Sequence, residues 1–205
     1  MSRILFCAAL AAVVLVASVA SAASWKVKFD LANLDGLPGD AGRASFVVQV
    51  NEEWAPLGAA RFKELVASGY FKGVRFFRNV KGFVTQFGLH GDPKVNAKWQ
   101  DNKLKDDPVK TSNKRGTISF ATAGENTRSN QLFINLGDNG NLDGMKFSPL
   151  AEVAGDGMGV VDRIYLGYGE QPSQGTITSE GNKYLKKSFP RLTYIEAATI
   201  LNEDL

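Results

Sequence analysis

The chain has 205 residues, a formal net charge of +3, 44% hydrophobic residues and 22% charged residues. These values are ordinary for a globular protein of one or at most two domains with a sizeable core. Lysine and arginine are dispersed along the sequence, so no nucleic-acid partner is expected.

The N-terminus has the pattern of a secretory signal peptide. Arg3 precedes an apolar run from Ile4 to Ala17, and Ala20-Ser21-Ala22 supplies the small residues of a cleavage site. We expect residues 1–22 to be removed and residues 23–205 to form a single domain. An uncleaved anchor is the weaker alternative.

The same pattern predicts the compartment, which is the endoplasmic reticulum lumen or the extracellular space. No later apolar run is long enough to span a membrane, so no membrane association is expected after cleavage. Whether the terminal Asn202-Glu203-Asp204-Leu205 acts as a retention signal stays open.

Short apolar or alternating runs predict most of the secondary structure as strands. In chain order these strands are 25–29, 44–50, 74–78, 83–87, 116–121, 132–135 and 150–154. The loop 35–40 between the first two strands indicates a hairpin. Residues 158–165 and 179–189 are expected to be short helices, residues 90–109 a loop, and residues 194–201 a strand or a helix.

Residues 54–70 form the best helix candidate. Pro56 suits a first turn and Gly69 suits a C-terminal stop. The expected buried side consists of Leu57, Ala60, Phe62, Leu65 and Val66.

Many short strands with few helices indicate a β-rich barrel or an α+β domain, and the pattern does not separate these two.

The sequence excludes a zinc site and leaves few residues for nucleophilic catalysis. The only cysteine, Cys7, lies within the predicted signal peptide, and His90 is the only histidine. A zinc site therefore cannot be assembled, and a Ser-His-Asp site would depend on a histidine in a polar loop. Gly155–Gly159 has neither a Walker lysine nor the dinucleotide-binding spacing.

One arginine lies in a segment that is rich in aromatic residues. Residues 76–88 read FFRNVKGFVTQFG, which places Arg78 among four phenylalanines. A guanidinium stays charged and is costly to bury without a partner. A fixed donor beside an apolar pocket could hold a peptide group, whereas an ordinary surface arginine stacked on Phe76 or Phe77 is the alternative.

Three ordered segments resemble the cyclophilin family. The stretch from Gly69 to Gly88 resembles the family signature F-[HF]-R-x-x-x-G-F-x-x-Q-x-G-x, and the stretch from Arg115 to Leu136 resembles S-M-A-x-A-G-x-N-x-x-x-S-Q-F-F-I. Leu142-Asp143-Gly144 follows at the family's distance. The matching positions are Phe76, Arg78, Gly82, Phe83, Gln86, Gly88, Ser119, Ala121, Ala123, Gly124, Asn126, Gln131, Phe133 and Ile134.

The resemblance implies a mainly β fold, an eight-stranded antiparallel closed β-barrel capped by two α-helices. It implies peptidyl-prolyl cis-trans isomerase activity without a metal or another cofactor. The expected partners are proline-containing segments of client proteins that fold in the secretory pathway, and a monomer is expected.

The resemblance also implies the site. Arg78, Phe83 and Gln86 match the catalytic positions, where the arginine donates to the prolyl nitrogen. Phe83 and Phe133 match rings that enclose the proline. The remaining substrate-binding positions are Val84, Ala121, Thr122, Gln131, Leu142 and Phe147.

Several positions depart from the family pattern. Phe77 stands where histidine is frequent, Val84 where methionine is frequent, and Phe147 is expected to fill the place of a missing histidine. Cyclosporin binding is expected to be weak, because Asn141 stands where sensitive relatives have tryptophan. A cyclophilin-like binding module or chaperone with little turnover is the main alternative, and an unrelated β-rich lectin or inhibitor is a weaker one.

Overall fold

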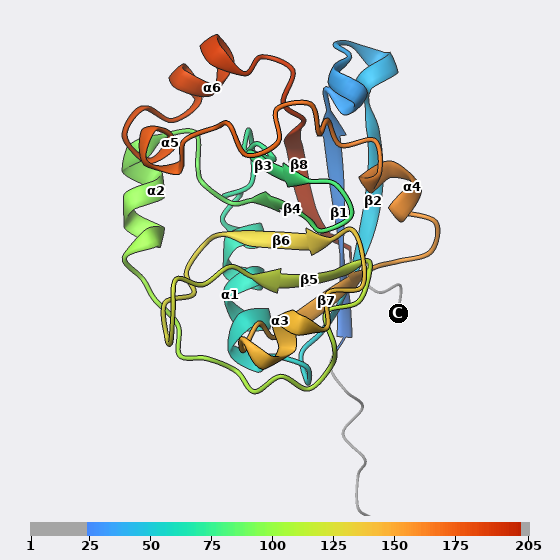
Figure 1. Ribbon diagram of the computed structural model, residues 1–205, viewed down its shortest axis with the longest axis vertical. Coiled ribbons are helices and arrows are strands. Elements are labelled where there is room, and N and C mark those ends of the chain that lie inside the picture. Colours follow the sequence, from blue (N-terminus) through green and yellow to red (C-terminus); the bar gives the residue numbers. More distant parts are fainter. Residues whose placement is uncertain (1–23, 202–205) are drawn as a thin grey trace, which may run out of the picture.

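The computed structural model describes residues 24–201, so the predicted signal peptide and Asn202–Leu205 lie outside the described residues. Eight antiparallel strands form one curled sheet in the order β3-β4-β6-β5-β7-β2-β1-β8 (Figure 1). This arrangement confirms the mainly β prediction. The strands are β1 Ser24–Ala32, β2 Ala44–Asn51, β3 Arg78–Val80, β4 Val84–Phe87, β5 Thr117–Phe120, β6 Leu132–Asn135, β7 Pro149–Val153 and β8 Tyr194–Leu201.

The two ends of the sheet approach each other just before β3. An isolated bridge pairs Arg75 with Tyr194, and the amide of Phe76 donates to the carbonyl of Thr193 at 3.0 Å. No strand ladder joins β3 to β8 in residues 24–201. The sheet is therefore a curled half-barrel, and a fully closed barrel stays a prediction.

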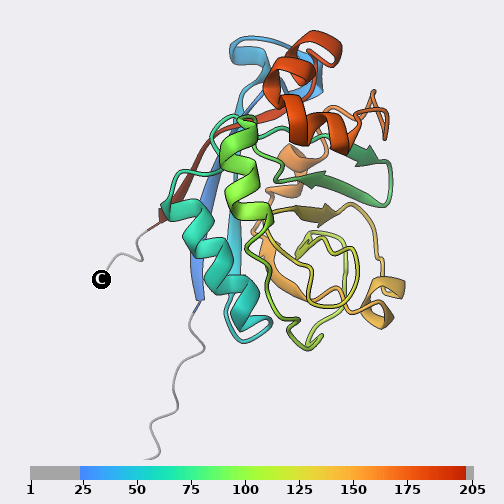
Figure 2. The same ribbon diagram turned by 90° about the vertical axis from the view of Figure 1, so that its left-hand side faces the viewer.

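The expectation of two capping helices is wrong. The described chain contains α1 Pro56–Ala67, α2 Pro93–Gln100, α3 Asn141–Gly144, α4 Met158–Val161, α5 Gln174–Glu180 and α6 Asn182–Ser188, with short 3-10 turns at Leu34–Gly36 and Asp40–Gly42. Helix α1 packs on β7 and β8, whereas α5 contacts both α2 and α6 (Figure 2). Within residues 24–201, no helix has the length and apolar character of a membrane span.

Alternation along the first two strands builds the main core. Val27 and Phe29 of β1 and Phe46 of β2 are buried, while the side chains between them face outward. The Phe29 ring lies 5.3 Å from Phe46 and 6.2 Å from Phe62 of α1, between ring centroids. Burying each such ring contributes about 1.5–3 kcal/mol. Strands β1 and β2 pair antiparallel from Ser24↔Asn51 to Leu31↔Ala44, which confirms the predicted hairpin, and the inner face of this hairpin lies in the core.

Helix α1 confirms a helix within residues 54–70, although it is shorter than predicted, and it corrects part of the predicted face. Pro56 lies in the first turn, and Gly69 at φ +70° follows the last turn. Leu57 and Ala60 are exposed, which contradicts the expected buried side. The buried stripe is Gly58, Ala59, Arg61, Phe62, Leu65 and Val66, so Phe62, Leu65 and Val66 are confirmed, whereas Leu57 and Ala60 lie outside the face that packs on the sheet.

Residues 90–109 are not a continuous loop, because they contain α2. The Asp92 carboxylate caps this helix by accepting from the Lys94 amide at 2.8 Å, and Pro93 occupies the first turn. This is a standard helix start.

The predicted helix 158–165 is shorter in the structure, where it is α4. The predicted helix 179–189 is divided between α5 and α6 at Gly181, where φ is +59°.

Candidate functional site

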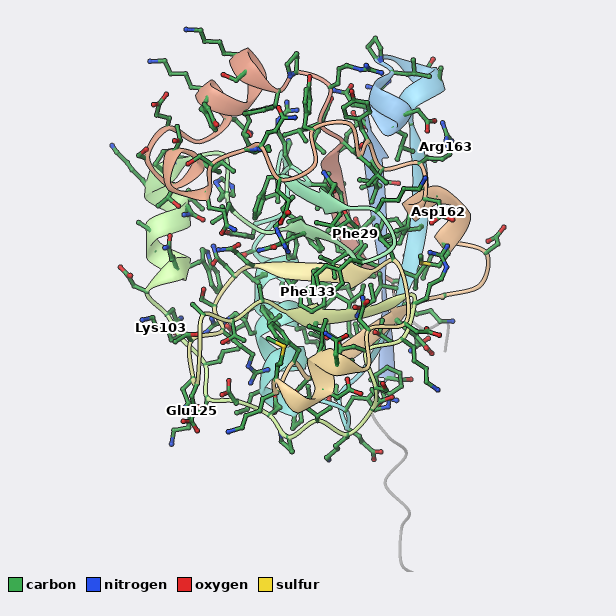
Figure 3. The ribbon with its side chains drawn as sticks, in the orientation of Figure 1. Phe29, Lys103, Glu125, Phe133, Asp162 and Arg163 are labelled. Atoms are coloured by element: carbon green, nitrogen blue, oxygen red, sulfur yellow. The ribbon has the colours of Figure 1, made fainter. Side chains whose placement is uncertain are left out.

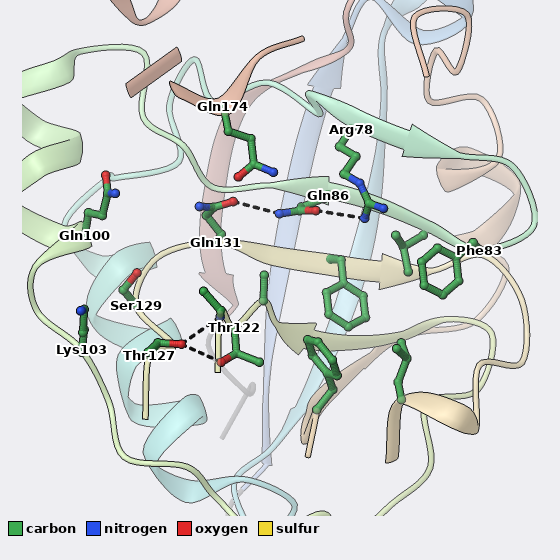
Figure 4. Close-up of a pocket in the computed structure, with 16 residues that line it drawn as sticks. Arg78, Phe83, Gln86, Gln100, Lys103, Thr122, Thr127, Ser129, Gln131 and Gln174 are labelled. Carbon is green, nitrogen blue, oxygen red and sulfur yellow. Dashed lines mark hydrogen bonds between the residues drawn. The ribbon is translucent and has the colours of Figure 1, made fainter. Parts of the chain in front are cut away.

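A groove of about 530 Å³ is lined by all ten residues that the sequence analysis predicted for the site (Figure 4). Arg78, Val84, Gln86 and Phe133 come from β3, β4 and β6, and Leu142 comes from α3. The others are Phe83, Ala121, Thr122, Gln131 and Phe147. Residues separated by up to 69 positions, from Arg78 to Phe147, therefore share one surface.

The floor of the groove is an apolar cluster separate from the main core. Val84, Phe133 and Leu142 are its buried members, and Phe83, Ala121 and Phe147 pack against them. The rings of Phe133 and Phe147 meet edge to face with centroids 5.6 Å apart, a favoured aromatic geometry. Figure 3 shows Phe133 over the middle of the sheet. This hollow suits a small apolar ring.

Strand alternation explains why these side chains turn outward. In β4, Thr85 and Phe87 face inward, and Phe87 belongs to the main core. Val84 and Gln86 therefore point to the opposite face. In β6, Phe133 lies directly across from Gln86 in the ladder, while Leu132 and Ile134 belong to the main core.

A row of polar side chains borders the hollow. Arg78 and Gln86 are direct cross-strand partners, and Arg78 Nη1 donates to Gln86 Oε1 at 3.4 Å. Gln86 Nε2 in turn donates to Gln131 Oε1 at 2.9 Å. Each amide is thus oriented by its neighbour, and the row presents donors and acceptors to anything that lies in the groove.

The structure explains why Arg78 lies among phenylalanines in the sequence. Its side chain is 30% exposed and lines the groove, whereas Phe76 is buried in the main core and Phe77 in a second apolar cluster. Arg78 Nε donates to Glu170 Oε1 at 2.7 Å. The charge therefore lies at a half-open rim with a carboxylate partner, which removes the cost of burying it alone.

Six groove residues were not among the predicted site residues. They are Gln100, Lys103, Ala123, Thr127, Ser129 and Gln174. Gln100 ends α2 and Gln174 begins α5, two elements that the sequence did not place correctly. Figure 4 shows Gln174 directed toward the groove from above Gln131. These residues extend the groove beyond the apolar hollow with polar side chains.

The polar end of the groove is held by a buried ion pair. Arg128 is 1% exposed and its Nη1 donates to Asp107 Oδ2 at 3.0 Å. Asp107 also accepts from the amides of Leu57 and Gly58 at the start of α1. Thr127, next to this arginine, approaches Thr122 at 2.8 Å between hydroxyl oxygens.

The apolar end depends on Asp143. Its carboxylate accepts from the Ser112 hydroxyl at 2.6 Å and from the Asn113 side chain at 2.7 Å. Asn113 also donates to the carbonyl of Phe147 at 2.9 Å. Burial alone would raise the pKa of Asp143, but these hydrogen bonds outweigh it and lower the pKa below its ordinary value of 3.8. The ionised carboxylate therefore fixes the segment that carries Leu142 and Phe147.

Known proteins resemble this chain in sequence and in fold. The family model for cyclophilin type peptidyl-prolyl cis-trans isomerase matches residues 39–181. A curated relative, peptidyl-prolyl cis-trans isomerase CYP18-1 of Arabidopsis thaliana, is 38% identical over 96 residues, covering 44% of this chain and 58% of that protein. Human peptidyl-prolyl cis-trans isomerase-like 3 is 35% identical over 124 residues, covering 57% of this chain and 73% of that protein.

Some relatives are much longer than the matching region. The chain covers 17% of peptidyl-prolyl cis-trans isomerase-like 2 of Gibberella zeae, at 35% identity over 100 residues and 46% of this chain. Several of the curated relatives are therefore covered over less than two thirds of their own length.

The fold matches a solved structure. The crystal structure of a cyclophilin type peptidyl-prolyl cis-trans isomerase of Cryptosporidium parvum aligns with a TM-score of 0.62 at 21% identity, covering 89% of this chain and 100% of that one. This likeness concerns the fold. Because the family model spans well over half of the sequence, this chain belongs to the family of cyclophilin type peptidyl-prolyl cis-trans isomerases.

Proposed function

We propose that the protein is a peptidyl-prolyl cis-trans isomerase that acts on X–Pro bonds in peptides and folding proteins. The observation that carries this proposal is the position of Arg78 and Gln86 at the rim of an apolar hollow. Unaided X–Pro isomerisation takes tens to hundreds of seconds, so its acceleration is a useful activity.

The proposed mechanism needs no change of protonation. Amide resonance sets a rotation barrier of about 18–20 kcal/mol, and twisting the bond localises a lone pair on the prolyl nitrogen. A donor aimed at that nitrogen stabilises the twisted state more than the planar state, which lowers the barrier. Arg78 is the proposed donor, because its guanidinium stays charged and lines the groove.

The other groove residues have proposed binding roles. Phe83, Phe133 and Leu142 would enclose the pyrrolidine ring, with Val84, Ala121 and Phe147 completing the hollow. Gln86 and Gln131 would hold the peptide backbone, and Thr122, which lines the groove, would contact the peptide beyond the hollow. A related Cryptosporidium parvum structure was determined in the presence of the dipeptide Ala-Pro, which supports a proline-containing ligand here.

A protease-coupled assay on a short X–Pro peptide tests the proposal. We expect the rate of cis-to-trans conversion to rise linearly with protein concentration. The rival, a binding module with little turnover, predicts saturable peptide binding with no increase above the uncatalysed rate. Binding without acceleration would therefore overturn the enzymatic proposal and favour the rival.

Two narrower parts of the proposal concern location and inhibition. We propose secretory-pathway clients on the basis of the pattern in residues 1–22. Microscopy of a chain with a tag inserted directly after residue 23, with and without residues 1–22, tests this and leaves the C-terminus free. Weak cyclosporin binding is proposed because Asn141, an exposed residue, stands where cyclosporin-sensitive relatives have tryptophan. Titration with the drug tests it, and an Asn141→Trp variant should bind more tightly.

A further inference from the structure

The segment that leads into α5 reaches Arg78 from 92 residues away in the sequence. The Asn79 amide, on the free edge of β3, donates to the carbonyl of Gly169 at 3.0 Å. Gly169 adopts φ +54°, a conformation that favours glycine, and its amide donates to the carbonyl of Leu166 at 3.0 Å. This turn is thus fixed to the strand beside Arg78, and the next residue is Glu170.

Two side chains hold the guanidinium at two different nitrogens. Glu170 Oε1 accepts from Nε at 2.7 Å and Gln86 Oε1 accepts from Nη1 at 3.4 Å. Within residues 24–201, Nη2 has no hydrogen-bond partner. The carboxylate therefore binds the edge of the guanidinium without occupying all of its donors, and donors remain for a bound peptide.

Such a contact matters because arginine is long and flexible. The side chain has high rotamer entropy, and a donor that must be aimed at one atom loses rate when it wanders. Glu170 is 60% exposed, so the Coulombic attraction is screened and weak. Its main effect is therefore orientation rather than a large change in the charge of the rim.

We propose that Glu170 is a positioning residue that orients Arg78 for isomerisation, an inference that rests on the proposed function. Glu170 acts through the Arg78 Nε–H contact and does not touch the substrate. The segment 166–174 then contributes to the groove, since Glu170 binds Arg78 and Gln174 lines the groove wall.

The kinetic test compares Glu170→Ala with Glu170→Gln. The alanine variant should lower kcat about two- to fivefold, in keeping with a weak exposed pair, while KM changes less than twofold. Glutamine keeps an acceptor oxygen and should restore most of the rate. Glu180→Ala is the matched control, because Glu180 is an exposed carboxylate of α5 without an ion pair in the described structure, and it should leave kcat unchanged.

A double variant isolates the coupling. In an Arg78→Lys background there is no Nε–H to orient, so adding Glu170→Ala should have no further effect on kcat. An equal fall in both backgrounds would overturn the proposal, as would an unchanged or increased kcat in Glu170→Ala. An increase would mean that the carboxylate competes with substrate for the guanidinium.

A measurement that does not depend on turnover separates this inference from the proposed function. Nuclear magnetic resonance of the arginine Nε–H groups should show an exchange-protected Arg78 signal in the wild type and in Glu170→Gln. The signal should lose its protection in Glu170→Ala. Protection that survives in Glu170→Ala overturns the positioning role. A protected signal in a wild type without isomerase activity overturns the proposed function and leaves the contact standing.

Discussion

Arg78 and Gln86 are direct partners across the β3–β4 ladder, and the guanidinium Nη1 lies 3.4 Å from the amide oxygen. Antiparallel register thus places the charged donor and the polar acceptor side by side on the outer face. A slip of one residue would turn either side chain to the other face of the sheet. The proposed site therefore depends on strand register as much as on residue type.

Gln86→Leu should lower kcat/KM about two- to tenfold, since a net hydrogen bond contributes about 0.5–1.5 kcal/mol. The change removes the contacts to both Arg78 and Gln131 while keeping the size of the side chain. Gln49→Leu, in β2 and remote from the groove, is the matched control. Equal kinetics for the two variants in the peptide assay would contradict the role of the polar row.

Phe133→Ala should weaken peptide binding about tenfold, or 1.4 kcal/mol, because it opens the floor of the hollow. It should also lower the free energy of unfolding by about 3–5 kcal/mol. Phe46→Ala, in the main core, should cost similar stability without loss of peptide affinity. Urea unfolding and peptide titration check both values, and a parallel loss of affinity in the two variants would refute a specific pocket.

Asp143 should make stability depend on acidic pH. Its folded-state pKa is lowered below 3.8, so the ionised carboxylate stabilises the folded state. This contribution is complete above about pH 4 and is lost as the pH falls through the lowered pKa. Urea unfolding between about pH 5 and 2 should show a shallower loss of stability for Asp143→Asn than for the wild type. Identical slopes would show that the hydrogen bonds to Ser112 and Asn113 do not matter.

Much of the fold could be predicted because its signals are local. The alternation in residues 25–29 and 44–50 marked the first hairpin, and Pro56 and Gly69 marked the ends of α1. Helix α2 was missed because Asp92-Pro93 is ambiguous: the same pair starts loops and caps helices. On α1, Leu57 and Ala60 were wrongly predicted to be buried, because their exposure depends on what the helix packs against.

The residues of the candidate site could likewise be predicted from the sequence only in part. Arg78, Phe83 and Gln86 lie within one short segment, so their pattern is visible in the sequence. Glu170 and Gln174 carry no local signal, because Glu170 reaches Arg78 only through the turn at Gly169 and Gln174 reaches the groove only through the start of α5. Such long-range contacts require the folded chain.

The most direct test of the account is the comparison of Arg78→Ala with the wild type in two measurements on one X–Pro peptide. We expect kcat/KM for isomerisation to fall about a hundredfold or more, as for loss of a charged donor to a transition state, while peptide affinity falls less than tenfold. Equal isomerisation rates for the two proteins, or losses of rate and affinity of the same size, would contradict the claim that this guanidinium stabilises the twisted bond.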